Sequence, residues 1–405
     1  MGRAKTTSDV LVERLIDRAD PLVHNDSQIM PNTTPFPTEP GELTAEWLTR
    51  TLRATEAIGS STVTGFSWAL VAEQGAAGTV GRASLEYDRA ELDAPPSVVL
   101  KFATPHAPIR TIMHRFGLYR AEVEFYRQLS AYAGIPTPRC YFADIDTDSG
   151  YFVLVMEDMK DSRLGDPLHP AVSDVEVAID HIAAFHARWW KHPRLRKLDW
   201  LFYPDGPAFE ARAAGLKMAF SGAVGTVRQR LGAQFPHVLS EACARILAGW
   251  PAFMASRTPA APTLVHRDFH LQQLFFPSAR GGRFAVYDWQ TLTIGCGADD
   301  VGRIIAMGLR SADRAAHEQR LIERYYTGLL QHGVPAYSAA QCQLDVRLGL
   351  TGSLFTNVVA AAAIDLSLAA QWEADTGVTL TYAIFDRLAK AFEAHEVLSL
   401  LPASV

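Results

Sequence analysis

Apolar and polar residues alternate along much of the chain between residues 61 and 159. Runs that alternate, or that are short and continuously apolar, occupy residues 61–73, 80–88, 97–103, 138–146 and 151–159. They are rich in β-branched and aromatic residues, which is typical of strands. One helical run, with apolar residues at every third or fourth position, lies among them at residues 118–134. The pattern predicts a mostly antiparallel sheet with one long helix inserted.

Helical spacing of apolar residues dominates after residue 160. The run at 173–191 begins with Ser173 and Glu176 in capping-box spacing, which predicts the start of a helix. Between residues 262 and 305, two short apolar runs flank the turn-rich sequence PSARGG and predict a hairpin.

These patterns divide the chain into three parts. Residues 1–40 lack sustained periodicity, end in a Pro- and Thr-rich stretch, and are expected to form an arm or linker. Residues 41–159, which begin with a short amphipathic helix, are expected to form a small β-rich lobe. Residues 160–405 are expected to form a large, mainly helical lobe.

Composition narrows the class of protein. The chain has 405 residues, 48% of them hydrophobic and 20% charged, as in ordinary globular proteins. Its 38 basic and 44 acidic residues give a net charge of −6, which argues against a surface that coats nucleic acid. The four cysteines lie far apart without a CxxC pair, so we expect reduced thiols in a cytoplasmic protein.

The most apolar stretch lies at residues 348–372. It contains Asn357 and Asp365, so a buried helix or helix pair explains it better than a membrane span does. No apolar segment follows Arg3 and Lys5, so we expect neither a signal peptide nor a membrane partner. The sequence does not indicate an oligomeric state.

Charged residues interrupt the apolar, aromatic run LVHRDFHLQQLFF at residues 264–276. Buried polar groups cost free energy when they are unpaired, so these residues are expected to form hydrogen bonds, bind a metal or do chemistry. One hypothesis is that His266, Asp268 and His270 form a two-histidine, one-carboxylate site for iron or zinc.

The order of polar residues along the whole chain favours a different chemistry. A glycine-rich turn with Gly75 and Gly78 precedes Lys101 on the next strand and Glu122 on the following helix. Taken singly, Lys101 could face solvent from an edge strand, and Glu122 could be a solvated helix charge. In series with Asp268 and a later aspartate, they form the arrangement that phosphoryl transfer from ATP requires.

Each part of this series has a physical role in such a reaction. Backbone N–H groups of glycines can approach a polyphosphate because no Cβ intervenes. A lysine places positive charge on the phosphates, and a glutamate on a helix holds the lysine in place. Two carboxylate or amide oxygens suit Mg²⁺, a hard cation. One further aspartate can orient the attacking hydroxyl group and accept its proton.

The same residues carry a resemblance to a known family. VHRDFHLQQLFF followed by VYDWQ resembles the His-x-Asp-x-His-x-x-Asn and Ile-Asp-Trp motifs of the aminoglycoside phosphotransferase and choline kinase superfamily. EQGAAGTVGR, YRAEVEFYRQL, GIPTPRCYFAD, VLVMEDM and IAAFHARWW resemble its ecdysteroid-kinase-like branch. The resemblance runs from about residue 40 to about residue 395 and implies an α+β, bilobal, protein-kinase-like fold.

The resemblance also implies roles for particular residues. Asp268 is expected to be the catalytic base, Lys101 to contact the ATP phosphates, and Glu122, rather than Glu124, to pair with Lys101. The remaining expected ligands are Asp288 and Gln273 for Mg²⁺, Gly75 and Gly78 over the phosphates, and the backbone of Glu157 and Met159 at the adenine edge.

Three further residues are expected to be structural. His266 is expected to pack in the core, His270 to brace the loop by hydrogen bonding, and Asp300 to anchor the catalytic loop. Two positions depart from the pattern of the superfamily, which has Gly in place of Arg267 and the metal-binding Asn in place of Gln273. The longer glutamine can reach the metal only if the backbone shifts or the metal lies farther away.

The sequence thus predicts an ATP- and Mg²⁺-dependent small-molecule kinase. A non-catalytic or repurposed kinase fold remains an alternative, because Gln273 replaces the asparagine. We expect the acceptor cleft between residues 200–250 and 340–380, where carboxylates are few and scattered (Asp205, Glu210, Asp345 and Asp365). A bulky, partly apolar alcohol therefore fits better than a polycationic aminoglycoside.

Overall fold

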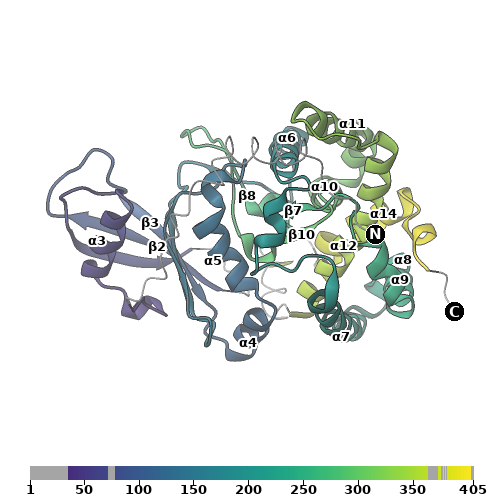
Figure 1. The fold of residues 1–405 in the computed structure, drawn as a ribbon, viewed down its shortest axis with the longest axis horizontal. Coiled ribbons are helices and arrows are strands. Elements are labelled where there is room, and N and C mark those ends of the chain that lie inside the picture. The colour runs from purple at the N-terminus through teal and green to yellow at the C-terminus, as the bar shows by residue number, and fades with distance from the viewer. Residues whose placement is uncertain are drawn as a thin grey trace, which may run out of the picture.

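A five-stranded antiparallel sheet forms the N-terminal part of the fold (Figure 1). The computed structural model describes residues 35–71, 78–363, 373–374, 377, 379 and 381–402. The strand order is β1 (Val63–Leu70), β2 (Gly78–Tyr87), β3 (Ser97–Ala103), β5 (Phe152–Glu157) and β4 (Cys140–Ile145). The sheet predicted from the alternating runs is therefore confirmed. Because β3 is the central strand, Lys101 does not lie on an edge.

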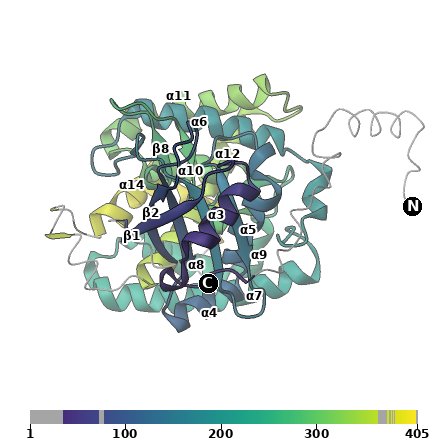
Figure 2. The same ribbon diagram turned by 90° about the vertical axis from the view of Figure 1, so that its left-hand side faces the viewer.

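Helices cover both faces of the sheet. Helix α3 (Ala45–Ala54) packs on one face, where Trp47 meets Phe142 edge-on with ring centroids 5.3 Å apart. The inserted helix α5 (Leu118–Gln128) packs on the other face, between the sheet and the helical part of the molecule (Figure 1). The short helix α4 (Ala107–Arg115) precedes α5. Figure 2 views the molecule from the side of the sheet, with α3 and β1 in front of the helical part.

The rest of the described chain is mainly helical, and the fold is of the α+β class. The helices are α6 (Val172–Arg188), α7 (Gly206–Leu231), α8 (His237–Ala248), α9 (Trp250–Ser256), α10 (Ala298–Met307), α11 (Ser311–Gln331), α12 (Ala339–Ala363) and α14 (Arg387–Ala394). The short strands are β6 (Arg163–Leu164), β7 (Thr263–Val265), β8 (Leu274–Phe276), β9 (Ala285–Val286) and β10 (Thr293–Gly295). The bilobal, protein-kinase-like architecture expected from the sequence is present. The exact lobe boundaries stay a prediction, and most of the expected arm lies outside the described residues.

The capping box predicted at the start of α6 is wrong. The helix begins at Val172 after Ala171, and no side chain caps its first turn. Glu176 instead forms an ion pair with Arg320 of α11, with 2.5 Å between Oε1 and Nη2. A tertiary contact therefore takes the side chain that the local pattern assigned to the helix end.

The run at residues 264–276 contains two strands in different sheets. Strand β7 pairs with β10, whereas β8 pairs with β9 to form the predicted hairpin. Between β7 and β8 the chain leaves the strand conformation and passes through a short 3-10 turn, Leu271–Gln273. This break lets the charged residues leave the core while their apolar neighbours stay in it.

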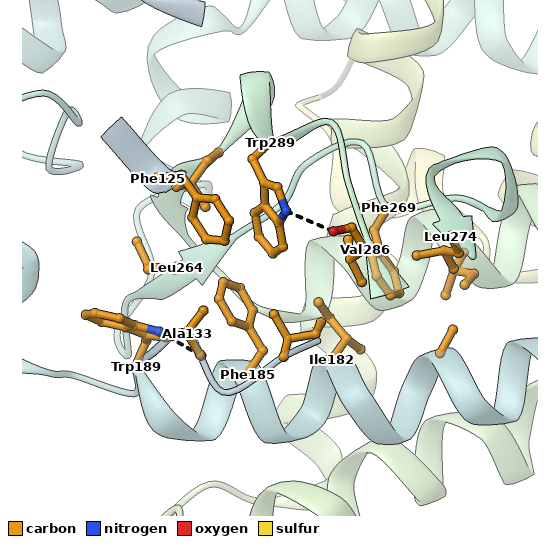
Figure 3. Packing of buried hydrophobic residues seen from close by; sticks show 14 of the residues in the cluster. Phe125, Ala133, Ile182, Phe185, Trp189, Leu264, Phe269, Leu274, Val286 and Trp289 are labelled. Carbon is orange, nitrogen blue, oxygen red and sulfur yellow. Dashed lines mark hydrogen bonds between the residues drawn. The ribbon is translucent and has the colours of Figure 1, made fainter. Parts of the chain in front are cut away.

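A packed aromatic core lies beneath this loop (Figure 3). Trp289 stacks on Phe125 of α5 with ring centroids 3.9 Å apart, and meets Phe185 of α6 edge-on at 5.3 Å. Its indole N–H donates to the Val286 carbonyl at 3.2 Å. The same cluster of buried side chains continues from α5 into α6, β8 and α10, so the sheet and the helical part share one core.

Helix α12 is the one described helix long and apolar enough, by length and composition, to cross a membrane. Half of its most apolar window is buried inside the fold. A Cβ on Gly349 would meet the Ala298 carbonyl oxygen at 2.9 Å, so glycine allows α12 to cross α10 closely. This packing agrees with the expectation of a core helix. Residues 364–372 of the predicted apolar stretch lie outside the described residues.

Candidate active site

Lys101 lies between two carboxylates at the junction of the sheet and the helical part. Its Nζ donates to both oxygens of Glu122, at 2.9 and 2.7 Å, and to Oδ1 of Asp288, at 2.8 Å. Lys101 is 7% exposed and Glu122 is 1% exposed. The stacking of Phe125 on Trp289 positions these groups, because it fixes the helix that carries Glu122 against the turn that begins at Asp288.

The two carboxylates stabilise the charge of Lys101 but repel each other. Burial by itself lowers the pKa of Lys101, but Asp288 and Glu122 outweigh that effect and hold its pKa above the ordinary value. Burial raises the pKa of Glu122. The charge of Lys101 opposes this rise, whereas the charge of Asp288 adds to it. The lysine therefore stays protonated. Two carboxylates against one ammonium group make the cluster receptive to a further cation.

Asp288 occupies a strained turn and is surrounded by amide donors. Its φ of 61° lies in the left-handed region, which aspartate tolerates better than most residues. Its Oδ2 accepts from the amide nitrogens of Gln273, at 3.0 Å, and Gln290, at 3.4 Å. The Gln290 side-chain oxygen is buried without a hydrogen-bond partner in the described part of the chain.

Asp268 lies in the loop after β7 and forms an ion pair with a buried arginine. Its Oδ1 accepts from Nη2 of Arg303, which is 5% exposed on α10, and lies 3.4 Å from Nε2 of His270. Burial raises the pKa of Asp268, but Arg303 and His270 outweigh it and hold that pKa well below its ordinary value. Asp268 is therefore ionised at neutral pH. Gln273 also reaches Asp268, with 3.5 Å between Nε2 and Oδ2.

Asp300 anchors the loop that carries Asp268, as the sequence predicted. Its carboxylate accepts from the backbone N–H groups of His266 and Arg267, each at 2.8 Å, and lies 3.2 Å from Nε2 of His186. His266 is fully buried, as expected for a packing residue, with its Nε2 3.0 Å from the Tyr287 carbonyl oxygen. His270 contacts Asp268 directly, which agrees with its expected bracing role.

The predicted nucleotide-contacting residues of the sheet lie on β2, β3 and β5 and in the segment after β5. A Cβ on Gly78 would meet the Phe102 carbonyl oxygen at 2.6 Å, so only glycine lets β2 lie this close to β3 beside Lys101. Gly75 lies outside the described residues. The Met159 carbonyl accepts from the Ser162 N–H at 2.9 Å, whereas the Met159 N–H makes no bond within the described part of the chain. The Glu157 N–H donates to the Arg139 carbonyl at 2.8 Å.

One large cavity joins these groups. Its volume is about 1100 Å³, and Gly78, Lys101, Glu122, Glu157, Met159, Asp268, Gln273 and Asp288 all line it. The cavity continues between α7, α9 and α12, so the segments predicted to form an acceptor cleft do line it. A single ligand pocket commonly has about 300–1,000 Å³, so this cavity is larger than one ligand usually needs.

The chemistry of the donor groups fits Mg²⁺. Asp288 offers a carboxylate, and rotation of the Gln273 amide would turn its oxygen toward the same space. The unpartnered oxygen of Gln290 is a third candidate ligand. Oxygen donors of this kind suit Mg²⁺, which completes its shell with water and phosphate.

The alternative site for iron or zinc lacks the required geometry. No group of three or more His, Cys, Asp or Glu side chains among the described residues is arranged to hold a metal ion. His266 faces the Tyr287 carbonyl group, whereas His270 faces Asp268. The two histidines therefore have different partners.

The sequence analysis did not identify four side chains that line the cavity or contact one of its lining residues. They are Arg212, Arg257, Gln290 and Arg303. For Arg303 the signal was available, since it is a lone cation in the apolar stretch VGRIIAM, three residues after Asp300. For Arg212 and Arg257 there was no such signal, because single arginines in amphipathic helices are common.

The comparisons with known proteins agree with this geometry. Residues 81–338 match the family model described as "Phosphotransferase enzyme family". A comparison with curated proteins found no match. The choline kinase from Cryptosporidium parvum Iowa II is 10% identical, with a TM-score of 0.51 and coverage of 88% of this chain and 96% of that chain.

Two other solved structures align less closely. Choline kinase LicA from Streptococcus pneumoniae is 11% identical, with a TM-score of 0.46 and coverage of 86% of this chain and 98% of that one. Aminoglycoside phosphotransferase APH(3'')-Id from Streptomyces rimosus, solved with ADP and streptomycin, is 16% identical, with a TM-score of 0.43 and coverage of 76% and 97%. At these identities the likeness concerns the fold.

Proposed function

Because the chain belongs to the phosphotransferase enzyme family, we propose that it transfers the γ-phosphoryl group of ATP to a hydroxyl group of a small metabolite. The observation that carries the proposal is the convergence of Lys101, Glu122 and Asp288 on the cavity that also contains Asp268. Phosphoryl transfer needs positive charge on the phosphates and a carboxylate at the attacking hydroxyl group, and this cavity supplies both.

In the proposed reaction the acceptor hydroxyl oxygen attacks the γ-phosphorus. The bond from that phosphorus to the β–γ bridging oxygen breaks, and ADP leaves with its electrons. The low pKa of Asp268 makes it a weak base, so its main task is to orient the hydroxyl group and take its proton late. Mg²⁺ held by Asp288 and Gln273, when bound, would neutralise charge that develops on the phosphates.

An assay of phosphate transfer tests the proposal. Full-length protein is incubated with ATP labelled at the γ-phosphate and a panel of alcohols, with Mg²⁺ and with EDTA. We expect a labelled phosphate ester, and we expect Asp268→Asn to lower kcat about 10²–10⁴-fold while a fluorescent ATP analogue still binds. Lys101→Met should weaken both binding and turnover.

Asp148→Asn is the matched control, because Asp148 is exposed and does not line the cavity. It should behave as the wild type does. Full turnover by Asp268→Asn would refute the assignment of the base.

A kinase fold that binds nucleotide without transferring phosphate is the second candidate. The observation that favours it is the position of the Gln273 amide nitrogen, which faces both Asp288 and Asp268. If Gln273 binds the metal through its oxygen, Gln273→Asn should change kcat by about tenfold or less, since the amide is retained on a shorter arm. An inactive wild type together with an active Gln273→Asn variant would establish the non-catalytic alternative instead.

A further inference from the structure

The cavity extends beyond Asp268 into the helical part, where residues of α7, α9 and α12 line it. The walls of this extension are largely apolar and aromatic. They include Phe202, Phe209 and Leu216 from the α7 region, Phe253 from α9, and Phe355 and Val359 from α12. We call this extension the helical pocket. Its lining would exclude water from the body of an acceptor.

The charged groups of the helical pocket are mostly positive. Arg212, Arg257 and Arg267 line it, and Asp299 is the carboxylate among them. Asp299 is shared, since its Oδ2 pairs with Nη2 of Arg257 and lies 3.3 Å from Nη1 of Arg267. Three arginines against one carboxylate leave two positive charges. Asp268 at the border does not change this balance, because Arg303 pairs with it.

Arg212 has no carboxylate partner among the described residues. Its guanidinium carbon lies 4.3 Å from the ring centroid of Phe202, a cation–π contact that leaves the N–H groups free to donate. Burial, with the nearby positive charge of Arg267, lowers the pKa of Arg212 to about 10. Burial also lowers the pKa of Arg267. Asp299 opposes this change, whereas the positive charge of Arg257 adds to it. An anion placed between Arg212 and Arg267 would relieve this repulsion.

Arg267 is held in a backbone conformation that disfavours it. Its φ of 70° lies in the left-handed region, which is unfavourable for a residue with a Cβ but not for glycine. Its side chain is 31% exposed, although the loop lies deep in the molecule, because it faces the cavity. Backbone strain of this kind is found mostly at functional sites, where the side chain has a role in binding or catalysis.

Apart from Asp268 and Asp299, which both pair with arginines, the described carboxylates that the sequence placed near the acceptor cleft do not line the pocket. Among the described residues, Asp205 pairs with Arg196, and Asp345 accepts from Tyr337 and Gln341. Neither these two carboxylates nor Glu210 line the cavity. The pocket therefore lacks the acidic character that a polycation needs.

We infer that the acceptor is an alcohol with an apolar body and an oxyanion group, a carboxylate or a phosphate, which Arg212 and Arg267 bind while the hydroxyl group lies at Asp268. Guanidinium groups recognise such oxyanions by charge-assisted, often bidentate hydrogen bonds. The role of the hydroxyl group rests on the proposed function, whereas the binding of the oxyanion does not.

Calorimetric titration of the full chain without nucleotide tests the inference. The probes are four eight-carbon alcohols that differ only at the far end: 8-hydroxyoctanoate, 8-hydroxyoctyl phosphate, octane-1,8-diol and 8-aminooctan-1-ol. We expect one or both anionic probes to bind about tenfold or more tightly than the diol, and the amine to bind most weakly. The ratio between the two anions identifies the preferred oxyanion.

Two variants assign the effect to the arginines. Arg212→Met and Arg267→Gly should each remove most of the preference for anions, and Arg267→Gly should not lower the melting temperature because it relieves backbone strain. Arg196→Met is the matched control, since Arg196 is exposed and also lies over an aromatic ring, that of Tyr203 at 3.8 Å. It should leave the preference unchanged.

The outcomes separate this inference from the proposed function. Equal binding of the diol and the anions, or an unchanged preference in both arginine variants, would overturn the inference even if alcohols are phosphorylated. Arginine-dependent binding of anions without phosphate transfer to any alcohol would support the anion site and refute the proposed reaction.

Discussion

Asp300 is a buried carboxylate, and both of its oxygens accept hydrogen bonds from groups of the protein. It accepts from two consecutive backbone N–H groups and contacts His186, which in turn lies 2.9 Å from the Tyr325 hydroxyl oxygen. The sequence predicted this anchoring role from the motif alone. The ion pair of Arg303 with Asp268, formed three residues later on the same helix, was not predicted. A motif identifies the anchor, whereas the partner of the base depends on how α10 faces the loop.

Replacement of Asp300 should destabilise the protein strongly. Asp300→Ala leaves the N–H groups of His266 and Arg267 without an acceptor in a buried site, so we expect the free energy of unfolding to fall by about 3–5 kcal/mol. Urea unfolding measures this change. Asp180→Ala, which removes an exposed partner of Arg324, should change the free energy by about 0.5 kcal/mol or less. Similar values for the two variants would contradict the anchoring role.

Among the elements, the segment after β5 connects the sheet to the helical part. Asp158 lies there and accepts from Nε of Arg82 on β2, at 2.6 Å, and from Oγ of Ser97 on β3, also at 2.6 Å. Burial raises the pKa of Asp158, but the hydrogen bonds from Arg82 and Ser97 outweigh it and lower that pKa below 3.8. These contacts fix the edge of the cavity at which adenine is expected to bind.

The lowered pKa of Asp158 predicts how the stability of this segment depends on pH. The stabilisation is present above the pKa of the unfolded chain, near 3.8, and is lost as the pH falls through the lower folded pKa. Asp158→Asn should therefore cost about 1 kcal/mol at pH 7, with Arg82 partly exposed, and the difference should shrink in acid. Urea unfolding at pH 7 and at the lowest pH that keeps both proteins folded measures it. A difference that grows in acid would contradict this sign.

In the whole molecule, the cavity lies between two parts that share a core. Because Trp289 packs against both α5 and α6, the turn with Asp288 is fixed relative to the sheet and to the helices at once.

The family and the fold are shown, whereas the resemblance to the ecdysteroid-kinase-like branch, the use of ATP and Mg²⁺, and the cytoplasmic location stay predictions. The helical pocket is a feature of the whole molecule, since its arginines come from α7, from the residue after α9 and from the catalytic loop.

Much of the fold could be predicted because its signals are local. Alternating and short apolar runs located the five strands, and the resemblance to the family motif placed Glu122 rather than Glu124 opposite Lys101, which the structure bears out as a contact. The capping box at Ser173 failed because α6 begins at Val172, before Ser173, and Glu176 pairs with Arg320 of another helix. The run at 264–276 gave no sign that its two halves enter different sheets, since periodicity does not specify the partner of a strand.

The sequence by itself determined the order of the elements and the identity of the polar residues between Lys101 and Asp288, because both follow from local periodicity and motif spacing. Only the tertiary structure decided which charges neutralise one another. Arg303 pairs with Asp268, and Asp299 is shared by Arg257 and Arg267, which leaves the helical pocket positive. Coulomb interactions depend on distances through space, and helix packing sets those distances.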